Sequence, residues 1–484
     1  MSTTHFDVLI LGAGLSGIGA ACHLTRKMNH KTYAILERRE AIGGTWDLFR
    51  YPGIRSDSDM STFGFNFRPW REPKVLADGP AIKRYVMEAA EQYGVPPHIR
   101  FGRSVTHAEW SSAQKQWTVT AHNDQTGQIE QYTAQFLIAA TGYYRYDQGF
   151  TPEFPGRERF QGTIVHPQHW PENLDYAGKK VVVIGSGATA ITLVPALAQG
   201  GAQVTMLQRS PTYVLSVPAI DPLASRLAQV LPVKWVYAAT RLRNIGMQRM
   251  LFRVSRRYPK LMRGLLKKLA NRELGGVVDI KHFSPHYDPW DQRLCVVPDG
   301  DLFQVLRQGQ AQVVTDTIAH FDATGIQLTS GKHLEADMIV TATGLNLQLF
   351  GGATMAVDGQ PVVIQDRLVF KGMMIEDVPN LASILGYTNA SWTLKADIIC
   401  EHFLRIMAYM EKNRLKVVTP RALGATRTDD TVMGSLQSGY VRRGAESLPR
   451  QGHRAPWKML NDYLHDAIAL KLGSVRHEAL EYRE

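Results

Sequence analysis

The stretch that decides the fold lies near the N-terminus and reads Phe6-Asp-Val-Leu-Ile-Leu-Gly12-Ala-Gly14-Leu-Ser-Gly17. An apolar, β-rich run leads into Gly-x-Gly-x-x-Gly, and a helix-compatible stretch follows. The first glycine permits a tight turn, the second lets the backbone approach a pyrophosphate, and the third lets helix pack on strand. A second apolar run, 33–36, ends at Glu37, whose carboxylate is placed to accept ribose hydroxyls. We predict a dinucleotide site here, with Ser16 in its phosphate turn and the phosphates facing the N–H groups of the helix start.

A second unit of the same kind reads Lys180-Val-Val-Val-Ile-Gly185-Ser-Gly187-Ala-Thr-Ala190. Its next strand, 203–208, ends at Arg209 and Ser210 in place of an acid. A guanidinium accommodates a 2′-phosphate, which a carboxylate would repel. We therefore predict FAD at the first site and NADPH at the second. The residues predicted to hold NADPH in this unit are Gly185, Ser186, Gly187, Ala188, Thr189, Ala190, Arg209 and Ser210.

Two further strands share one ending, Ala140-Thr-Gly142 and Ala342-Thr-Gly344, which suits points where the chain crosses between domains. The prediction is an α/β protein with two Rossmann-like dinucleotide-binding domains, for FAD and NADPH, the second inserted in the first, and with a helical subdomain. The FAD domain comprises 1–145 and 345–484. The NADPH domain comprises 146–220 and 286–344, and 221–285 form the basic helical subdomain.

The composition is that of a globular protein, with 484 residues of which 44% are hydrophobic and 20% charged. The three cysteines, Cys22, Cys295 and Cys400, form no closely spaced pair, which argues against a disulfide scaffold, a zinc ribbon and a dithiol redox centre. We expect no metal site. The longest uncharged run, 181–208, is interrupted by glycines and a proline, so it is interpreted as buried strand, turn and helix. Without a basic N-terminal signal region, the expected compartment is the cytoplasm.

The net charge of +11 is concentrated in one segment. Residues 221–275 contain 13 Lys and Arg but only Asp221 and Glu273 as acids, and apolar residues alternate with the basic ones at helical spacing. A helical subdomain with a solvated basic face explains this pattern. Peripheral adhesion of 221–275 to an anionic membrane is the alternative, and we expect no nucleic-acid partner.

Two longer motifs carry a family resemblance. Phe160-Gln-Gly162-Thr-Ile-Val-His166-Pro-Gln-His-Trp170-Pro171 matches the pattern FxGxxxHxxxWP, and Gly43-Gly-Thr-Trp46 to Asp57 matches a second pattern. Both resemble type I Baeyer–Villiger flavin monooxygenases. The stretch 43–70 resembles most the ethionamide monooxygenase branch, which activates thioamides. Relatives that oxygenate amines or sulfides usually have Tyr or Phe at the position of Trp170. The likeness covers almost the whole chain and is weakest in 221–275 and beyond about 420.

The resemblance implies that NADPH reduces FAD, that O2 adds to give a C4a-peroxyflavin, and that this species converts ketones into esters or lactones. Sulfides or thioamides are a second implied substrate class. A flavin monooxygenase acting mainly on sulfur or nitrogen is the rival enzyme. A basic protein that binds membrane or nucleic acid is the rival of a different class.

The resemblance also assigns residues. Arg293, in Asp291-Gln-Arg293, is the implied catalytic cation, and Asp57 is its orienting partner. Gln292 stands where many members have Lys, so selectivity for NADPH over NADH would be weaker or would rest on Arg209 and Ser210 alone. His166 and Trp170 would couple NADPH binding to domain movement, although plain packing explains Trp170 equally well. Arg55 and Ser56 would reach the nicotinamide nucleotide. The residues placed beside FAD are Thr45, Trp46, Asp47, Leu48, Asp57 and Val105.

Overall fold

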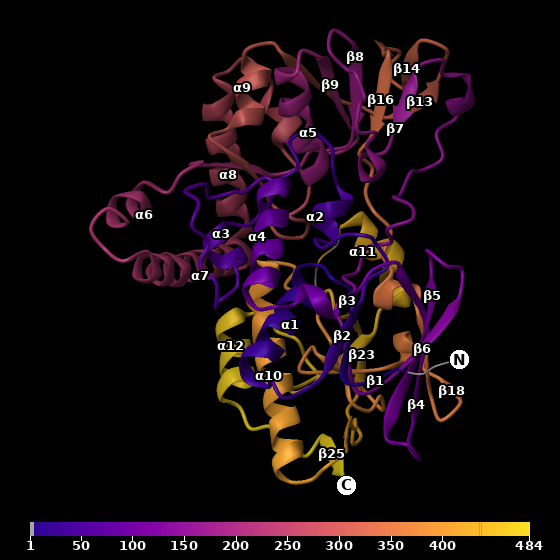
Figure 1. Ribbon diagram of the computed structural model, residues 1–484. Coiled ribbons are helices and arrows are strands. Elements are labelled where there is room, and N and C mark those ends of the chain that lie inside the picture. The colour runs from indigo at the N-terminus through magenta and orange to yellow at the C-terminus, as the bar shows by residue number, and fades with distance from the viewer. Residues whose placement is uncertain (1–3, 435, 437) are drawn as a thin grey trace.

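The structure is a computed structural model that describes residues 4–434, 436 and 438–484. Figure 1 shows two lobes, each built on its own sheet, and a helical projection at the side. The lower lobe contains both ends of the chain, and the upper lobe is formed by its middle part. Among the described residues, none of the helices has both the length and the apolar character needed to cross a bilayer.

The sheet of the first lobe has nine strands. Its strands β3, β2, β1, β6 and β21 run parallel to their neighbours, and β4 and β5 add an antiparallel meander to β6. The centre is apolar on both faces, as a parallel sheet covered by helices requires; Val8, Leu9 and Ile10 have no exposed surface. The strands are β1 (Thr4–Leu11), β2 (Tyr33–Leu36), β3 (Ile99–Arg100), β4 (Arg103–Ser111), β5 (Gln116–Asn123), β6 (Ile129–Ala139), β17 (Thr354–Val357), β18 (Gln360–Pro361) and β21 (Leu381–Ser383).

Beside this sheet, α1 (Leu15–Lys27) packs against both α4 (Gly79–Gln92) and α10 (Trp392–Lys412). The helix α1 is buried over its first ten residues, because it lies between β1 and α10. Residues 15 to 27 and 392 to 412 are far apart in sequence, so the C-terminal part of the chain completes the lobe that the N-terminal part begins.

The sheet of the second lobe has five parallel strands in the order β12-β9-β8-β16-β7. The uncharged run 181–208 forms β8, α5 and β9, as predicted. The strands and helices are β7 (Thr163–Val165), β8 (Lys180–Ile184), α5 (Ala188–Gln199), β9 (Gln203–Gln208), α9 (Asp301–Arg307), β12 (Ala311–Thr315) and β16 (Met338–Thr341). Along the chain, all of these elements come after β6 and before β17 of the first sheet. The second unit is therefore inserted in the sequence of the first. The predicted fold class is confirmed.

A segment of the first lobe contributes to the core of the second. Phe49 and Tyr51 pack in one cluster with residues of α5 and β8. At Gly53 the chain passes so close to α5 that an added Cβ would lie 2.5 Å from the Thr192 carbonyl oxygen. The lobes therefore meet through a packed contact in addition to the two crossing segments.

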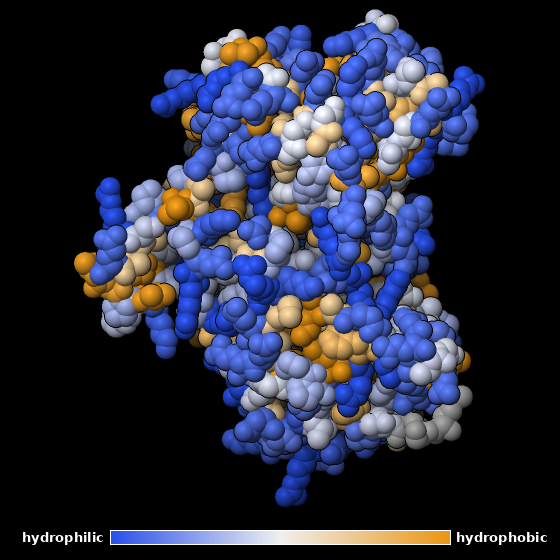
Figure 2. All heavy atoms as spheres, turned by 45° about the horizontal axis from the view of Figure 1, so that its top comes forward, coloured by the Kyte–Doolittle hydropathy of each residue, from blue (hydrophilic) through white to orange (hydrophobic). Residues whose placement is uncertain are grey.

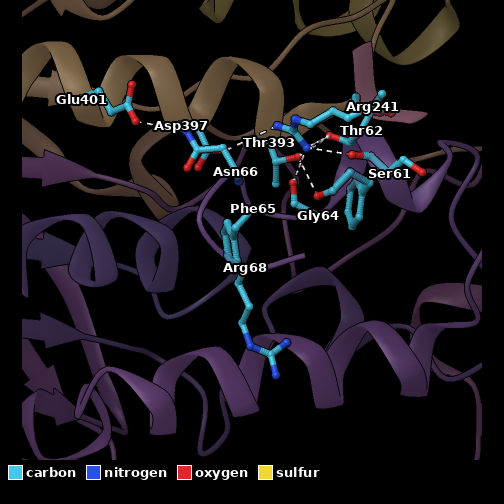
Figure 3. A network of polar contacts seen from close by, with 12 residues as sticks. Ser61, Thr62, Gly64, Phe65, Asn66, Arg68, Arg241, Thr393, Asp397 and Glu401 are labelled. Atoms are coloured by element: carbon cyan, nitrogen blue, oxygen red, sulfur yellow. Dashed lines mark hydrogen bonds and ion pairs between the residues drawn. The ribbon is translucent and has the colours of Figure 1, made fainter. Parts of the chain in front are cut away.

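The predicted helical subdomain consists of α6 (Pro222–Leu227), α7 (Val233–Arg257) and α8 (Pro259–Leu274). In Figure 1, α6 and the start of α7 form the projection. Arg241 of α7 is buried and donates hydrogen bonds to the carbonyls of Ser61, Thr62 and Gly64, at 2.9, 3.2 and 2.8 Å. Figure 3 shows this guanidinium pointing into the 61–64 turn of the first lobe, next to Asp397 of α10. The middle of α7 is thus fixed to the first lobe.

Candidate functional site

A cavity of about 580 Å³ lies between the two lobes. Its wall includes Gly12 and Glu37 from the first lobe, Thr189 from α5 of the second, and Arg293 just before β11 (Cys295–Pro298). The cavity therefore connects the first dinucleotide turn with the start of the second helix.

The first glycine turn has the geometry that a pyrophosphate needs. Gly12 has φ +97°, and a Cβ there would lie 2.9 Å from the Ala140 carbonyl oxygen. A Cβ on Gly17 would lie 1.8 Å from the Gly12 carbonyl oxygen, so only glycine lets α1 start so close to β1. Gly14 is the N-cap of α1 and gives no side-chain bond, which leaves the first N–H groups of the helix available to a phosphate.

Glu37 and Ser16 lie in the cavity wall, as a FAD site requires. One oxygen of the buried Glu37 carboxyl accepts the Ala13 N–H at 2.5 Å and the other accepts the Arg39 N–H at 2.8 Å. Burial raises the pKa of Glu37, and these two N–H groups oppose that rise. Ser16 accepts a hydrogen bond at 2.7 Å from the indole of Trp392, at the start of α10. The phosphate turn is thereby joined to α10 across 376 residues of sequence.

The residues predicted to run beside FAD divide into two groups. Thr45, Trp46 and Val105 lie in the cavity wall. Asp47 and Leu48 are absent from it. The Asp47 carboxylate is buried and bonded to Arg39 and to Lys83, the latter at 2.6 Å. Leu48 packs in the core of the second lobe. Because Asp47 follows Trp46 in the short helix α2 (Thr45–Leu48), neighbouring positions point to different sides.

The second glycine turn is open. Gly185 has φ +142°, and a Cβ there would lie 2.4 Å from the Ala342 carbonyl oxygen. Around Gly187, the N-cap of α5, no atom lies within 4 Å of an ideal Cβ position. Ala188 and Thr189 reach the interlobe cavity, while Ala190 is buried under them. Ser186 donates to the Ser210 carbonyl at 2.8 Å, which closes the turn on the end of β9.

Four side chains predicted to contact NADPH differ in their partners. Arg209 is exposed and has no ion-pair partner within the described part of the chain, so its guanidinium is available to a 2′-phosphate. Ser210 next to it is exposed as well. Arg55 lies in the cavity wall, paired with Asp301 at 2.5 Å. Ser56 is buried, lines the same wall and exchanges hydrogen bonds with the backbone of Ser58.

Arg293 and Asp57, 236 residues apart in sequence, meet in the cavity wall. The Arg293 guanidinium donates to an Asp57 carboxylate oxygen at 3.1 Å. Burial alone would lower the pKa of Arg293, but the nearby hydroxyls of Tyr440, Tyr143 and Tyr144 together with Asp57 raise it well above its usual value. The Arg293 Nε–H is buried and has no hydrogen-bond partner among the described residues.

Three tyrosines beside Arg293 were missed by sequence analysis. The Tyr143 and Tyr144 hydroxyls lie 2.9 Å apart, and the Tyr143 ring stacks on Trp392 with centroids 5.2 Å apart. Tyr440 stacks on Tyr143 at 6.4 Å. Tyr143 and Tyr144 directly follow the Ala-Thr-Gly142 ending of β6. Their position at this crossing between the domains could have indicated that they lie near the site. Tyr440 lies in the C-terminal region, where no sequence motif indicates a place in the site.

The motif between the lobes forms a packed joint. The His166 Nε2–H donates to the Gly344 carbonyl at 3.2 Å, and Nδ1 accepts the Gln168 N–H at 3.2 Å. Burial lowers the pKa of His166, so the ring stays neutral and keeps both bonds. It thereby joins the two crossing segments. Trp170 is buried in the core of the second lobe, and a Cβ on Gly162 would strike the Asp337 carbonyl. Phe160 packs near Phe321, and Pro171 is exposed.

A second cavity, of about 620 Å³, shares a wall with the first. Ala390 lines both, Tyr387 faces the first, and Leu394 with Ile245 of α7 faces the second. These residues pack in one apolar cluster. Two buried acceptor oxygens in the second cavity, on Gln248 and Asn389, have no hydrogen-bond partner among the described residues. The exposed surface of this wall is mainly apolar, and Arg249, Arg253, Asp462 and His465 also line it.

The residues present fit FAD in the first turn and NADPH in the second. Residues 9–223, which contain both turns, match the family described as pyridine nucleotide-disulphide oxidoreductase. Fold and site thus define an oxidoreductase with two dinucleotide-binding domains. The three cysteines are all free and buried, so a dithiol centre of the kind in that description is not formed.

Comparison with known proteins narrows this class. The chain is 54% identical over 468 residues to the probable FAD-binding monooxygenase AlmA of Acinetobacter baylyi, covering 96% of this chain and 94% of the relative. It is 55% identical to the putative FAD-containing monooxygenase MymA of Mycobacterium tuberculosis, covering 96% and 95%. It is 51% identical to the FAD-containing monooxygenase EthA of Mycolicibacterium smegmatis, covering 99% and 97%. The chain belongs to this family of FAD-containing monooxygenases, and the predicted family is confirmed.

Solved structures agree in fold. An oxidized steroid monooxygenase bound to NADP matches with a TM-score of 0.77 at 23% identity, covering 99% of this chain and 100% of the other. The open form of cyclohexanone monooxygenase matches with a TM-score of 0.77 at 18% identity over the full length of both. At these identities the likeness establishes a shared fold.

Proposed function

We propose that this protein is an NADPH- and O2-dependent FAD monooxygenase that oxidises ketones to esters or lactones. The single observation that carries the proposal is the pair Arg293–Asp57 in the wall of the cavity that joins both dinucleotide turns. Bound FAD, once reduced by NADPH, supplies the activation of O2. The protein binds the cofactors, excludes water and stabilises charge.

Binding of the two dinucleotides is assigned to local features. The turn at Gly12 and Gly14 and the N–H groups of α1 would hold the pyrophosphate of FAD, and Glu37 would accept its ribose hydroxyls. The turn at Gly187 and the start of α5 would hold NADPH. Arg209 would bind the 2′-phosphate. Gln292 occupies the position at which many family members have a lysine, so this chain lacks that second cation for the phosphate.

Arg293 is proposed to hold a fixed positive charge beside the carbonyl that reacts. A guanidinium stays protonated at any working pH, and a preorganised cation stabilises negative charge as it develops on oxygen. Asp57 would orient the guanidinium, and its carboxylate favours the charged form. The free Nε–H gives Arg293 one donor that no described residue uses.

The second cavity is proposed to receive the part of the substrate away from the reacting carbonyl. Its wall is mainly apolar, and Ala390 is the small side chain between the two spaces. Ketones with an apolar body fit this arrangement. Sulfides and thioamides are proposed as a second substrate class, supported by the likeness of 43–70 to the thioamide-activating branch.

The remaining partners are proposed on charge. Residues 221–275 carry the whole net surplus, and this favours peripheral contact with an anionic membrane over a nucleic-acid partner. The proposed place of action is the cytoplasm, at or near the membrane face, where NADPH is supplied.

The variant Arg293→Ala tests the proposed reaction. We expect flavin reduction by NADPH to persist, because both dinucleotide turns are unchanged. Ester formation from a panel of linear, cyclic and aryl ketones should fall by roughly two to three orders of magnitude in kcat. Stopped-flow absorbance of the flavin and mass spectrometry of the products measure the two steps separately.

Arg307→Ala is the matched control, since the Arg307 guanidinium bonds the Glu273 carbonyl at 2.9 Å and lines neither cavity. It should retain ester formation. Equal ester yields from Arg293→Ala and the parent would remove Arg293 from the reaction. A parent protein that takes up no FAD would overturn the whole assignment.

A further inference from the structure

The structure divides the basic residues of 221–275 into two sets. Six of the 13 form ion pairs, and all but one of their acidic partners lie outside the segment. The paired residues are Arg241, Arg243, Arg249, Arg253, Arg256 and Arg263. The other seven have no ion-pair partner within the described ranges: Arg226, Lys234, Arg257, Lys260, Lys267, Lys268 and Arg272. Five of the 13 basic residues therefore pair the helices with the body of the protein.

The end of the projection is apolar. We call residues 220–235 the tip; it comprises α6, the turn after it and the start of α7. Figure 2 shows apolar surface gathered at the end of the projection, at the left edge of the molecule. Trp235 is 74% exposed and Val230 77% exposed. The other exposed large apolar residues of the tip are Ile220, Leu223, Leu231 and Val233.

The apolar surface continues along α7. Leu242 lies seven residues after Trp235, and Met250 lies eight residues after Leu242; both are exposed, and these spacings place the three on one face of the helix. The opposite face is fixed to the first lobe by Arg241. An outward apolar face that no described residue covers costs free energy in water, and large patches of this kind mark contact sites.

The charged residues of the tip indicate which kind of partner fits its apolar surface. Its single acid, Asp221, is occupied, because it caps α6 through the Leu223 and Ala224 N–H groups and pairs with Arg243. Arg226 and Lys234 remain as free cations beside the apolar residues. A second copy of the chain would bring like charges together, with no acid on the tip to pair them. An anionic lipid surface offers both phosphate groups and an apolar layer.

We propose that the tip inserts into the interfacial layer of an anionic lipid bilayer, with Trp235 and Val230 among the acyl chains and Arg226 and Lys234 at the headgroups. This refines the proposed membrane contact of 221–275, since attachment then depends mainly on apolar insertion and only in part on charge. The arrangement follows the rule for interfacial helices, whose apolar side chains enter the boundary between headgroups and acyl chains while Lys and Arg stay at the headgroups. It also predicts that binding persists at high salt, where charge alone would be screened.

Flotation of the FAD-loaded protein with vesicles tests the inference. The probes are vesicles of phosphatidylcholine alone and vesicles of phosphatidylcholine mixed with the anionic lipid phosphatidylglycerol. We expect the parent to float with anionic vesicles at low salt and in part at about 1 M salt. The double variant Val230→Ser/Trp235→Ser should lose at least tenfold in binding at both. Arg226→Gln/Lys234→Gln should lose binding mainly at low salt.

The matched control is Ile129→Ser, which removes an apolar side chain that is 54% exposed on β6, away from the tip. It should float like the parent. The parent's failure to float with anionic vesicles at low salt overturns both the inference and the membrane contact. Equal flotation of parent and Val230→Ser/Trp235→Ser overturns the insertion while leaving attachment by charge. A tip variant that changes the oligomeric state without lipid shows a protein interface and overturns the inference. NADPH-dependent flavin reduction, measured in the same samples, verifies that each variant is folded.

Discussion

At the scale of single residues, one buried histidine makes a defined contribution to how stability responds to pH. His402 of α10 has no exposed surface, and its Nδ1–H donates to the Leu470 carbonyl at 2.7 Å. Burial, with the nearby positive charges of Lys371 and Arg405, lowers the pKa of His402 to about 3. The native ring therefore stays neutral at pH values where an unfolded histidine takes up a proton.

The sign of the effect follows from this difference. Below about pH 6.5 the unfolded state binds a proton that the native state does not, so the free energy of unfolding falls with the pH until about pH 3. Between pH 6.5 and pH 5 we expect His402 to account for a loss of roughly 2 kcal/mol. In His402→Gln this part of the slope should vanish, as measured by urea unfolding at several pH values. His320→Gln, at an exposed position, should leave the slope as it is. A slope unchanged by His402→Gln would contradict the assignment.

The sequence predicted individual site residues where a motif fixes the backbone. Gly12, Gly14 and Glu37 follow from the strand, turn and helix in which they lie, and such units are local. Tyr440 approaches Arg293 only through tertiary packing of the C-terminal region, and no local pattern reports that contact. Asp47 lies in a local motif, but its side chain points away from the cavity because it bonds to Arg39 and Lys83. The motif predicted its position in the chain and not the direction of its side chain.

At the scale of elements, one side chain attaches α7 to the first lobe. The Arg241 guanidinium bonds three carbonyls of the 61–64 turn and the Tyr237 hydroxyl, and lies 3.7 Å from Asp397. Arg241→Met leaves these buried acceptors without their donor. We expect a loss of roughly 3–5 kcal/mol in stability and faster protease cleavage in 228–258. Thermal unfolding and limited proteolysis measure the two effects.

Arg249→Met is the comparison within the same helix. Arg249 pairs with Asp462 at 2.8 Å, but its side chain is 31% exposed. Water screens such a pair, so the loss should stay near about 1 kcal/mol or less. Equal losses in the two variants would show that Arg241 does not hold the helix in place.

Periodicity in the sequence predicted the helices of 221–275 but not their attachment. The acids that pair with Arg249, Arg256 and Arg263 are Asp462, Asp291 and Asp288, which lie outside the segment. A charge count along the chain treats each cation as free, and only the fold shows which ones are neutralised. The charge pattern therefore located the basic helical segment, while the exposed apolar face of α7 became apparent only once its buried face was known.

At the scale of the whole molecule, the contact between the lobes depends on Gly53. This residue has φ +80°, and a Cβ would lie 2.5 Å from the Thr192 carbonyl oxygen and 2.7 Å from the Ala196 Cβ. In Gly53→Ala the helix α5 must shift relative to the first lobe, and the second dinucleotide turn shifts with it. We expect normal FAD content but at least tenfold slower flavin reduction by NADPH, measured by stopped flow, if roughly 1.4 kcal/mol of cofactor positioning is lost.

Gly94→Ala is the control that distinguishes backbone strain at positive φ from a steric clash between the lobes. Gly94 has φ +65°, and no atom lies within 4 Å of its ideal Cβ position. This variant carries the cost of an alanine at positive φ, about 1 kcal/mol, without a clash between lobes. It should lose some stability and reduce its flavin at the parental rate. Equal reduction rates in both variants would contradict the role of Gly53.

The sequence predicted the architecture of two units, one inserted in the other, because each unit begins with its own glycine turn and the two Ala-Thr-Gly endings mark the crossings. It did not predict that 49–51 pack into the core of the other lobe, because apolar residues in a motif do not reveal which core they enter. Contacts between units depend on relative placement, and local patterns contain no information on it.

The burial of all three cysteines has a practical consequence for spectroscopy. Burial raises the pKa of the Cys22 and Cys295 thiols to about 12, and that of the Cys400 thiol rises as well, so few thiolates exist at neutral pH. The three natural cysteines should therefore react little with maleimide reagents. Val233→Cys would introduce one reactive thiol beside Trp235, where an attached fluorophore or spin label would report the polarity of its surroundings and its depth in a lipid layer.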